Sequence, residues 1–105
     1  MKFEAKKIDL TLELTTLSGE EITLTPRKLV TAEETVNILR SWTAAEKNAK
    51  TNVDRVELLA KELSILYPKE KEWFLSNFDM TTLSDMLNFV ASSIGGIRKN
   101  AESSS

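Results

Sequence analysis

A chain of 105 residues with 41% hydrophobic residues supports one domain, which would bury roughly two thirds of the surface that the unfolded chain exposes. The formal net charge of -2 gives no electrostatic reason to expect nucleic acid or an acidic membrane surface as the main partner. Because the chain has no Cys and no His, it lacks disulfides, thiolate nucleophiles, the commonest metal ligand and the usual proton shuttle at neutral pH.

No stretch has the pattern of a targeting or membrane segment. Residues 1–10 contain neither a continuous apolar core nor a small-residue cleavage site, and no window approaches the ~20 apolar residues of a membrane span. We therefore expect a cytosolic protein.

The first predicted element is an antiparallel β-hairpin over residues 6–25. Apolar and polar residues alternate over 8–15 and again over 21–25, and this period of two predicts strands with one buried face. Gly19 between the two runs marks the turn, and Phe3 is a candidate extension of the first strand. Two strands alone are marginal in water, so their apolar face is expected to lie on helices or to join strands of another copy.

A helix is predicted over residues 32–48. Thr31 and Glu34 form a capping box, which places the start of the helix after Thr31. One stripe of the helix is formed by Ile38, Trp42, Ala45 and Ala49.

A second helix is predicted over residues 53–67, with Thr51 or Asn52 as its cap. Leu58 and Ile65 lie opposite its predicted core face, so the helix is either sandwiched inside its own domain or lends one side to another chain. The core face comprises Val53, Val56, Leu59, Ala60, Leu63, Leu66 and Tyr67.

Two further helices are predicted over residues 69–77 and 81–95. Pro68 ends the preceding helix and is a candidate for the first position of the next. Trp73, Phe74 and Leu75 span more than half of a helical circumference, so we expect one of them to face outward.

The last predicted helix begins near Asp79, just upstream of a loose capping box formed by Thr82 and Asp85. Gly95 and Gly96 suit a left-handed C-cap. Its buried stripe comprises Met80, Leu83, Met86, Leu87, Val90, Ile94 and Ile97.

Together the elements predict an α+β fold, with one N-terminal hairpin followed by a bundle of about four helices. Residues 1–97 are expected to form a single domain, and the polar residues 98–105 are expected to be a flexible tail.

No residue pattern points to a reaction, a metal site or a cofactor. The acidic pairs are expected to cap turns and helices: Glu20 with Glu21, Glu33 with Glu34, and Asp79 with Asp85. Three basic doublets, Lys6-Lys7, Arg27-Lys28 and Arg98-Lys99, lie among at least as many acids and have no interleaved aromatics, so a solvated surface is favoured over nucleic-acid binding. A Ser or Thr nucleophile with a Lys base has no spacing in its favour. We predict no enzymatic activity.

The feature with functional content is a surplus of apolar residues. A compact bundle that uses all of them as core is one interpretation, and a groove or self-association surface for an apolar helical segment is the other. The candidate residues for partner binding or self-association are Trp42, Leu58, Ile65, Trp73, Phe74, Leu75, Phe78 and Phe89.

The order of elements, ending in PKEKEWFLSNFDMTTLSDMLNFVASSI, resembles the tail assembly chaperones of long-tailed bacteriophages of Gram-positive hosts. The resemblance covers most of residues 1–97 and rests on pattern and size. It implies a helical protein of the host cytoplasm, absent from the mature virion, that keeps the hydrophobic tape measure protein soluble until the tail tube polymerises around it. It also implies homo-oligomers, possibly spiral, and no catalytic residues. The alternative is a small immunity or regulatory protein that binds one defined protein target.

Overall fold

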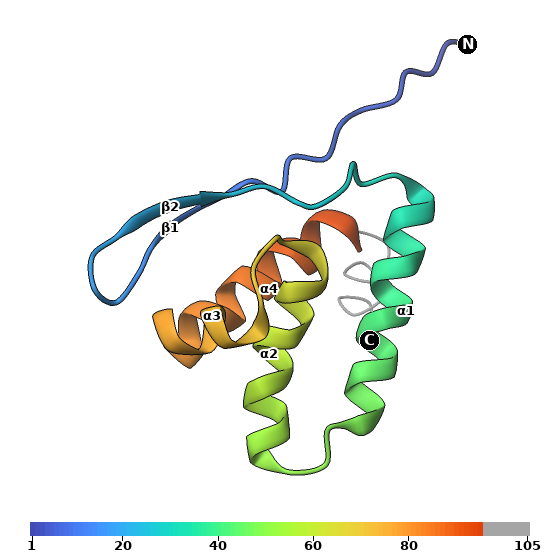
Figure 1. Ribbon diagram of the computed structural model, residues 1–105. Coiled ribbons are helices and arrows are strands. Elements are labelled where there is room, and N and C mark those ends of the chain that lie inside the picture. Colours follow the sequence, from blue (N-terminus) through green and yellow to red (C-terminus); the bar gives the residue numbers. More distant parts are fainter. Residues whose placement is uncertain (96–105) are drawn as a thin grey trace.

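The computed structural model describes residues 1–95, in which a two-stranded hairpin precedes four helices (Figure 1). The predicted α+β fold is confirmed. The elements are β1 (Leu12–Thr15), β2 (Glu21–Leu24), α1 (Ala32–Asn48), α2 (Asn52–Leu66), α3 (Lys71–Asn77) and α4 (Met80–Ile94). The predicted roles of Gly96 and Ile97 and the predicted tail over 98–105 lie outside the described residues.

The hairpin is shorter than the span of 6–25 that the alternation predicts. β1 and β2 are antiparallel, with Leu12 opposite Leu24 and Leu14 opposite Ile22. Gly19 in the connecting turn has φ +91°, a left-handed conformation that favours glycine. The strand pattern therefore continues beyond the residues that have a pairing partner.

Helices α1 and α2 begin at the predicted caps. The hydroxyl of Thr31 accepts a hydrogen bond from the Glu34 N–H at 3.0 Å at the start of α1. At the start of α2, Thr51 and Asp54 form a complete capping box. These local hydrogen bonds satisfy backbone donors that the first turn leaves unpaired, which explains why both starts are readable from sequence.

The other helix ends differ in detail from the predictions. Pro68 does not open α3, because α2 ends at Leu66 and α3 begins only at Lys71. The cap of α4 is Asp79, whose carboxylate accepts a hydrogen bond from the Thr82 N–H at 3.1 Å, so the predicted capping box of Thr82 and Asp85 is wrong. Gly95 ends α4 with φ -108°, so the predicted left-handed C-cap is wrong at this residue.

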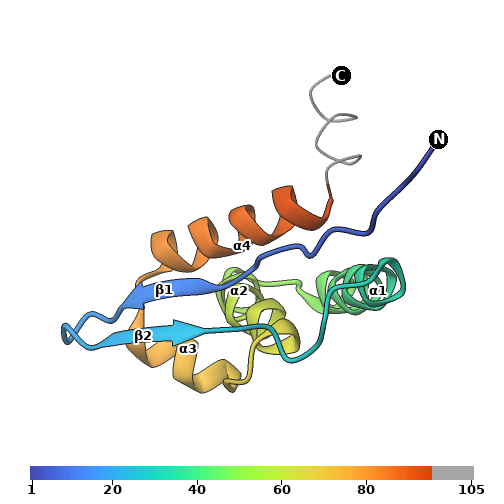
Figure 2. The same ribbon diagram turned by 90° about the horizontal axis from the view of Figure 1, so that it is seen from above.

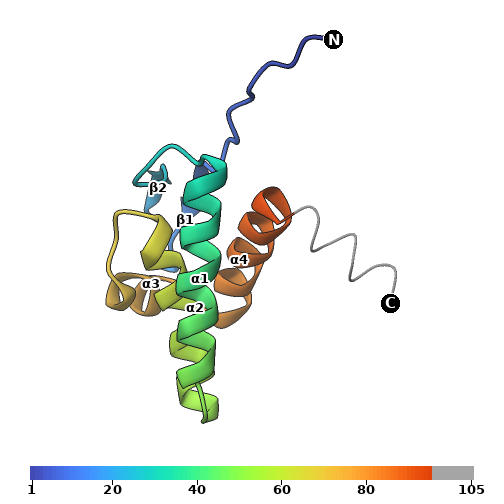
Figure 3. The same ribbon diagram turned by 90° about the vertical axis from the view of Figure 1, so that its right-hand side faces the viewer.

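Helix α2 is the centre of the bundle and packs against α1, α3 and α4 (Figures 2 and 3). Within one subunit α2 is therefore sandwiched between other helices, as one of the two predicted arrangements requires. Its fully buried side chains include Ala60 and Leu63.

Two residues of the predicted core face of α2 are exposed instead of buried. Val53 is 66% exposed and Val56 is 37% exposed. The first turns of α2 extend beyond α3 and α4 together with the end of α1 (Figure 1), so no neighbouring helix covers this part of the face. The same correction applies to Met80 at the first position of α4, which is also exposed.

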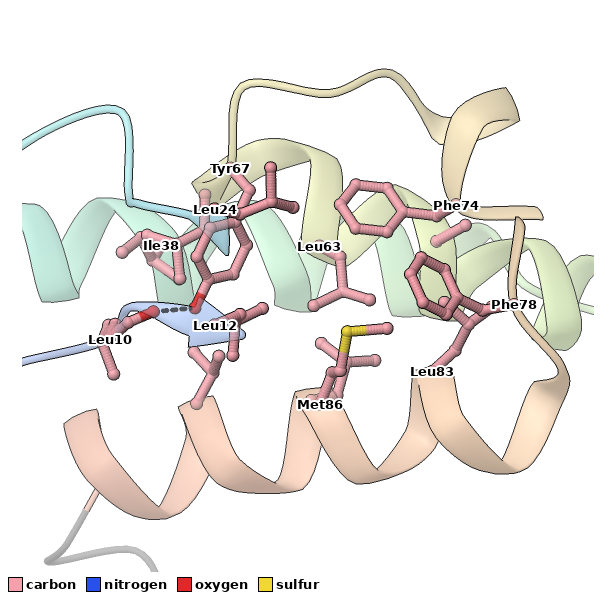
Figure 4. Packing of buried hydrophobic residues seen from close by; sticks show 14 of the residues in the cluster. Leu10, Leu12, Leu24, Ile38, Leu63, Tyr67, Phe74, Phe78, Leu83 and Met86 are labelled. Carbon is pink, nitrogen blue, oxygen red and sulfur yellow. Dashed lines mark hydrogen bonds between the residues drawn. The ribbon is translucent and has the colours of Figure 1, made fainter. Parts of the chain in front are cut away.

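The hairpin lies over the helices and closes the core from one side (Figures 2 and 4). Leu12 and Leu24 are buried against residues from α2 and α4. Tyr67, which is 0% exposed, donates a hydrogen bond from its hydroxyl to the carbonyl of Leu10 at 2.7 Å. This contact joins the residue after α2 to the segment before β1, across 57 positions of the chain.

Candidate protein-binding surface

Three of the eight predicted partner-binding residues belong to the core. Trp42, Phe74 and Phe78 are buried, and the indole N–H of Trp42 donates to the Glu62 carbonyl at 3.1 Å. Figure 4 shows Phe74 and Phe78 pointing into the space between the helices. In this conformation none of the three side chains has surface available for a partner.

Trp73 lies at the boundary between this core and the surface. Its ring meets those of Phe74 and Phe78 edge to face, with centroids 5.1 Å and 5.5 Å apart, and Lys69 Nζ lies 5.0 Å from the Trp73 ring centroid. Trp73 and Leu75 are both half-buried and pack against the core cluster. Of the three consecutive apolar residues 73–75, Phe74 points inward and its two neighbours retain some exposed surface.

Leu58 and Ile65 are half-buried on α2. Ile65 packs against the core cluster, whereas Leu58 lines a hollow of about 150 Å³ together with Ala45 and Ala49 of α1. Lys71 also lines this hollow, and its ammonium lies 3.0 Å from the Glu57 carboxylate. A hydrogen bond from Lys71 to Glu57, and the charge of that carboxylate, raise the pKa of Lys71.

Phe89 is the most exposed of the eight candidates, at 42%. It lies on the side of α4 away from the buried Leu87 and Val90. The hydroxyls of Ser92 and Ser93, one turn further on, donate to carbonyls within the helix at 2.7 Å and 2.8 Å. Both serines are small, and among the described residues they hydrogen-bond only within α4. A partner could therefore cover the Phe89 ring and these serines without breaking a hydrogen bond between two elements.

The structure also exposes apolar residues that sequence reasoning did not select. An open hollow of about 540 Å³ is lined by Ile8, Leu29, Val30 and Ala32, among other residues, between the N-terminal segment and the start of α1. The sequence signal was the apolar pair Leu29 and Val30 directly before the α1 cap, outside any periodic run. The large apolar side chains that are exposed include Met1, Phe3, Ile8, Leu17, Leu29, Val36, Val53, Val56, Met80 and Phe89.

The carboxylates of Asp54 and Asp79 take part in helix capping. Hydrogen bonds from the hydroxyl and N–H of Thr82 hold the pKa of Asp79 below its ordinary value, and backbone N–H groups of Lys50 and Thr51 lower the pKa of Asp54. Among residues 1–95, no three acidic side chains gather as a possible metal site. These observations describe capping, as the sequence predicts for Asp79.

Comparison of the chain with protein-family models, with curated proteins and with solved structures finds no match. Within the described part of the chain, no helix is both long enough and apolar enough to cross a membrane.

Proposed function

We propose that this protein is a binding protein rather than an enzyme, and that it holds apolar helical segments of another protein. The observation that carries the proposal is the exposure of large apolar side chains on a body that already has its own core. Phe89 on α4 and Val53 and Val56 on α2 are exposed, although the buried residues of the same helices form a continuous cluster. Contiguous exposed apolar surface is typical of sites that contact another polypeptide.

The contacts available suit a weak and reversible interaction. Complete burial of one large apolar side chain contributes about 1.5–3 kcal/mol, and Trp73, Leu75 and Phe89 are each partly covered already. A single copy would therefore hold its partner loosely. Several copies along one long partner chain would raise the overall affinity, because each later contact forms at high effective concentration.

The resemblance to tail assembly chaperones names the partner that we propose, the tape measure protein of a long-tailed phage. The protein would cover hydrophobic helical segments of the tape measure protein in the host cytoplasm and leave as the tail tube polymerises. Two features support this proposal: the small helical body that buries its own core, and the spare apolar side chains outside that core. The mechanism needs no bond to be made or broken, only reversible burial of apolar surface.

Co-expression with a phage tape measure protein tests the proposal. We expect the tape measure protein to become soluble and to co-purify with the chain. Phe89→Ser should reduce the amount recovered, whereas Asn88→Ser, a change at the exposed polar position beside it, should not. If the solubility of the tape measure protein is unchanged and no complex forms, the proposal is wrong.

A further inference from the structure

Residues 1–9, here called the N-terminal arm, lie at the surface of the protein, and residues 5–8 border the open hollow beside the start of α1. Every residue of the arm is exposed, and the Phe3 side chain is 87% exposed. Among the described residues, no backbone–backbone hydrogen bond joins the arm to the rest of the chain, although the Asp9 carboxylate accepts a hydrogen bond from the Thr11 N–H at 3.0 Å. The arm leads away from the body in the direction opposite to the hairpin (Figure 1). An aromatic side chain is thus held in solvent on an extended backbone with unused hydrogen-bonding groups.

The hairpin offers the complementary backbone groups. The described sheet has two strands, β1 and β2, so each strand has one outer edge. The Thr16 N–H donates to the Glu20 carbonyl at 2.9 Å. Because hydrogen-bonded and non-hydrogen-bonded pairs alternate in an antiparallel ladder, the N–H and C=O groups of Glu21 and Thr23 point away from β1. In Figure 2, α4 lies on the β1 side of the hairpin and α3 lies on the β2 side. Among the described residues, no backbone hydrogen bond joins Glu21 or Thr23 to either helix, so their outward N–H and C=O groups are unpaired.

The arm and the hairpin carry opposite net charges, and the arm has the alternating side-chain pattern of a strand. The arm has three lysines, Lys2, Lys6 and Lys7, against two acids, a difference of one positive charge (3 - 2 = +1). The hairpin segment 10–25 has three acids, Glu13, Glu20 and Glu21, and no Lys or Arg. Met1, Phe3 and Ala5 alternate with charged residues, which is the period of a strand with one apolar face.

The arm cannot reach this edge within its own subunit. It continues into β1 after only two residues, and the β2 edge lies on the far side of β1. To pair there, the arm would have to reverse direction and cross its own hairpin. A second copy of the chain meets no such obstacle.

We propose that the N-terminal arm of one copy adds to the outer edge of β2 of a second copy as a third strand. Backbone hydrogen bonds to Glu21 and Thr23 provide the pairing, Phe3 covers the half-buried Ile22, and the arm lysines face Glu20 and Glu21. This self-association does not depend on the identity of the partner proposed above.

Two sets of variants test this contact by light scattering across protein concentration. Glu4→Pro with Ala5→Pro removes the N–H donors of two adjacent residues, so one pairing donor is lost in either register. We expect the dissociation constant between copies to rise roughly tenfold or more, because the variant loses a hydrogen-bond donor and its proline rings disturb the strand pairing. Glu4→Ala, the matched control, should change it little.

Charge exchange gives the most specific readout. Lys6→Glu with Lys7→Glu makes both arm and hairpin acidic, and Glu20→Lys with Glu21→Lys makes both basic. We expect each variant alone to associate more weakly than the wild-type chain. An equimolar mixture should form mixed assemblies at least as well as the wild-type chain, because every arm then meets a hairpin of opposite charge.

Three results would overturn the arm contact. The wild-type chain could stay monomeric at every concentration, the two prolines could leave association unchanged, or the two charge variants could fail to combine on mixing. Circular dichroism and the melting temperature of each variant establish that its body is folded. The arm makes no backbone–backbone hydrogen bond to the described body, so we expect melting temperatures close to wild type.

Discussion

Replacing Tyr67 by Phe isolates one hydrogen bond that joins the helices to the hairpin. The Tyr67 ring is completely buried, and its hydroxyl donates to the Leu10 carbonyl at 2.7 Å. The variant keeps the ring and its packing but leaves the buried carbonyl of Leu10 without this donor. Losing one partner of a buried hydrogen bond costs about 1–3 kcal/mol.

Urea unfolding at neutral pH measures the loss directly. For a domain of this size, a cost of about 1–3 kcal/mol corresponds to a melting temperature lower by roughly 4–24 °C. Amide hydrogen exchange should also become faster around Leu10 and Leu12, because the segment before β1 loses a fixed contact. If the free energy of unfolding changes by less than about 0.5 kcal/mol, the hydrogen bond does not hold the hairpin as the structure implies.

Four further predictions have defined outcomes. Burial, with a smaller effect of the Asp9 charge, raises the pKa of Tyr67. The contribution of Tyr67 to stability is therefore complete below about pH 10 and is lost as pH rises through the raised pKa. In urea titrations, Tyr67→Phe should remove this fall of the unfolding free energy at alkaline pH. Leu63→Ala should lower the unfolding free energy by about 3 kcal/mol because Leu63 is buried. Val53→Ala should lower it by less than about 0.5 kcal/mol because Val53 is exposed. Equal losses for the two variants would contradict the described packing of α2. Asp79 has a lowered pKa, so its contribution to stability is present above pH 3.8 and is lost as pH falls through the lowered pKa. Asp79→Ala should therefore weaken the fall of the unfolding free energy at acid pH, while Asp79→Asn should retain the helix cap at neutral pH. Thr31→Ala should lower the unfolding free energy by about 1 kcal/mol in urea. An unchanged urea midpoint would mean that the cap of α1 does not contribute to stability.

Helix starts and the hairpin turn are predictable from this sequence because their causes are local. Thr31, Thr51 and Gly19 act on backbone groups within four positions of themselves, so residue type and spacing suffice. The predicted bounds of α1 agree with the structure, and those of the other helices differ by one or two residues.

Burial is less predictable because it depends on how far neighbouring elements extend. The period of α2 places Val53 and Val56 on the same face as Leu63, but it carries no information on where α3 and α4 stop. For the same reason, sequence reasoning counted Phe74 and Phe78 among the candidates for partner binding, although both lie in the core.

The candidate surface is also only partly readable from sequence. Phe89 falls off the buried stripe of its helix, and periodicity alone identifies it as exposed. Leu29 and Phe3 lie in irregular segments, where no period predicts the orientation of a side chain. Their exposure follows from the path of the chain, which the tertiary structure alone defines.

The most direct test of the central claim measures whether the exposed apolar side chains bind a partner helix. Purified wild-type chain and Phe89→Ser should be titrated against soluble apolar helical peptides from a phage tape measure protein, with binding followed by calorimetry. The proposed function predicts saturable binding by the wild-type chain, with a negative heat-capacity change from apolar burial, and weaker binding by Phe89→Ser. No binding by the wild-type chain, or equal binding by both proteins, would contradict it.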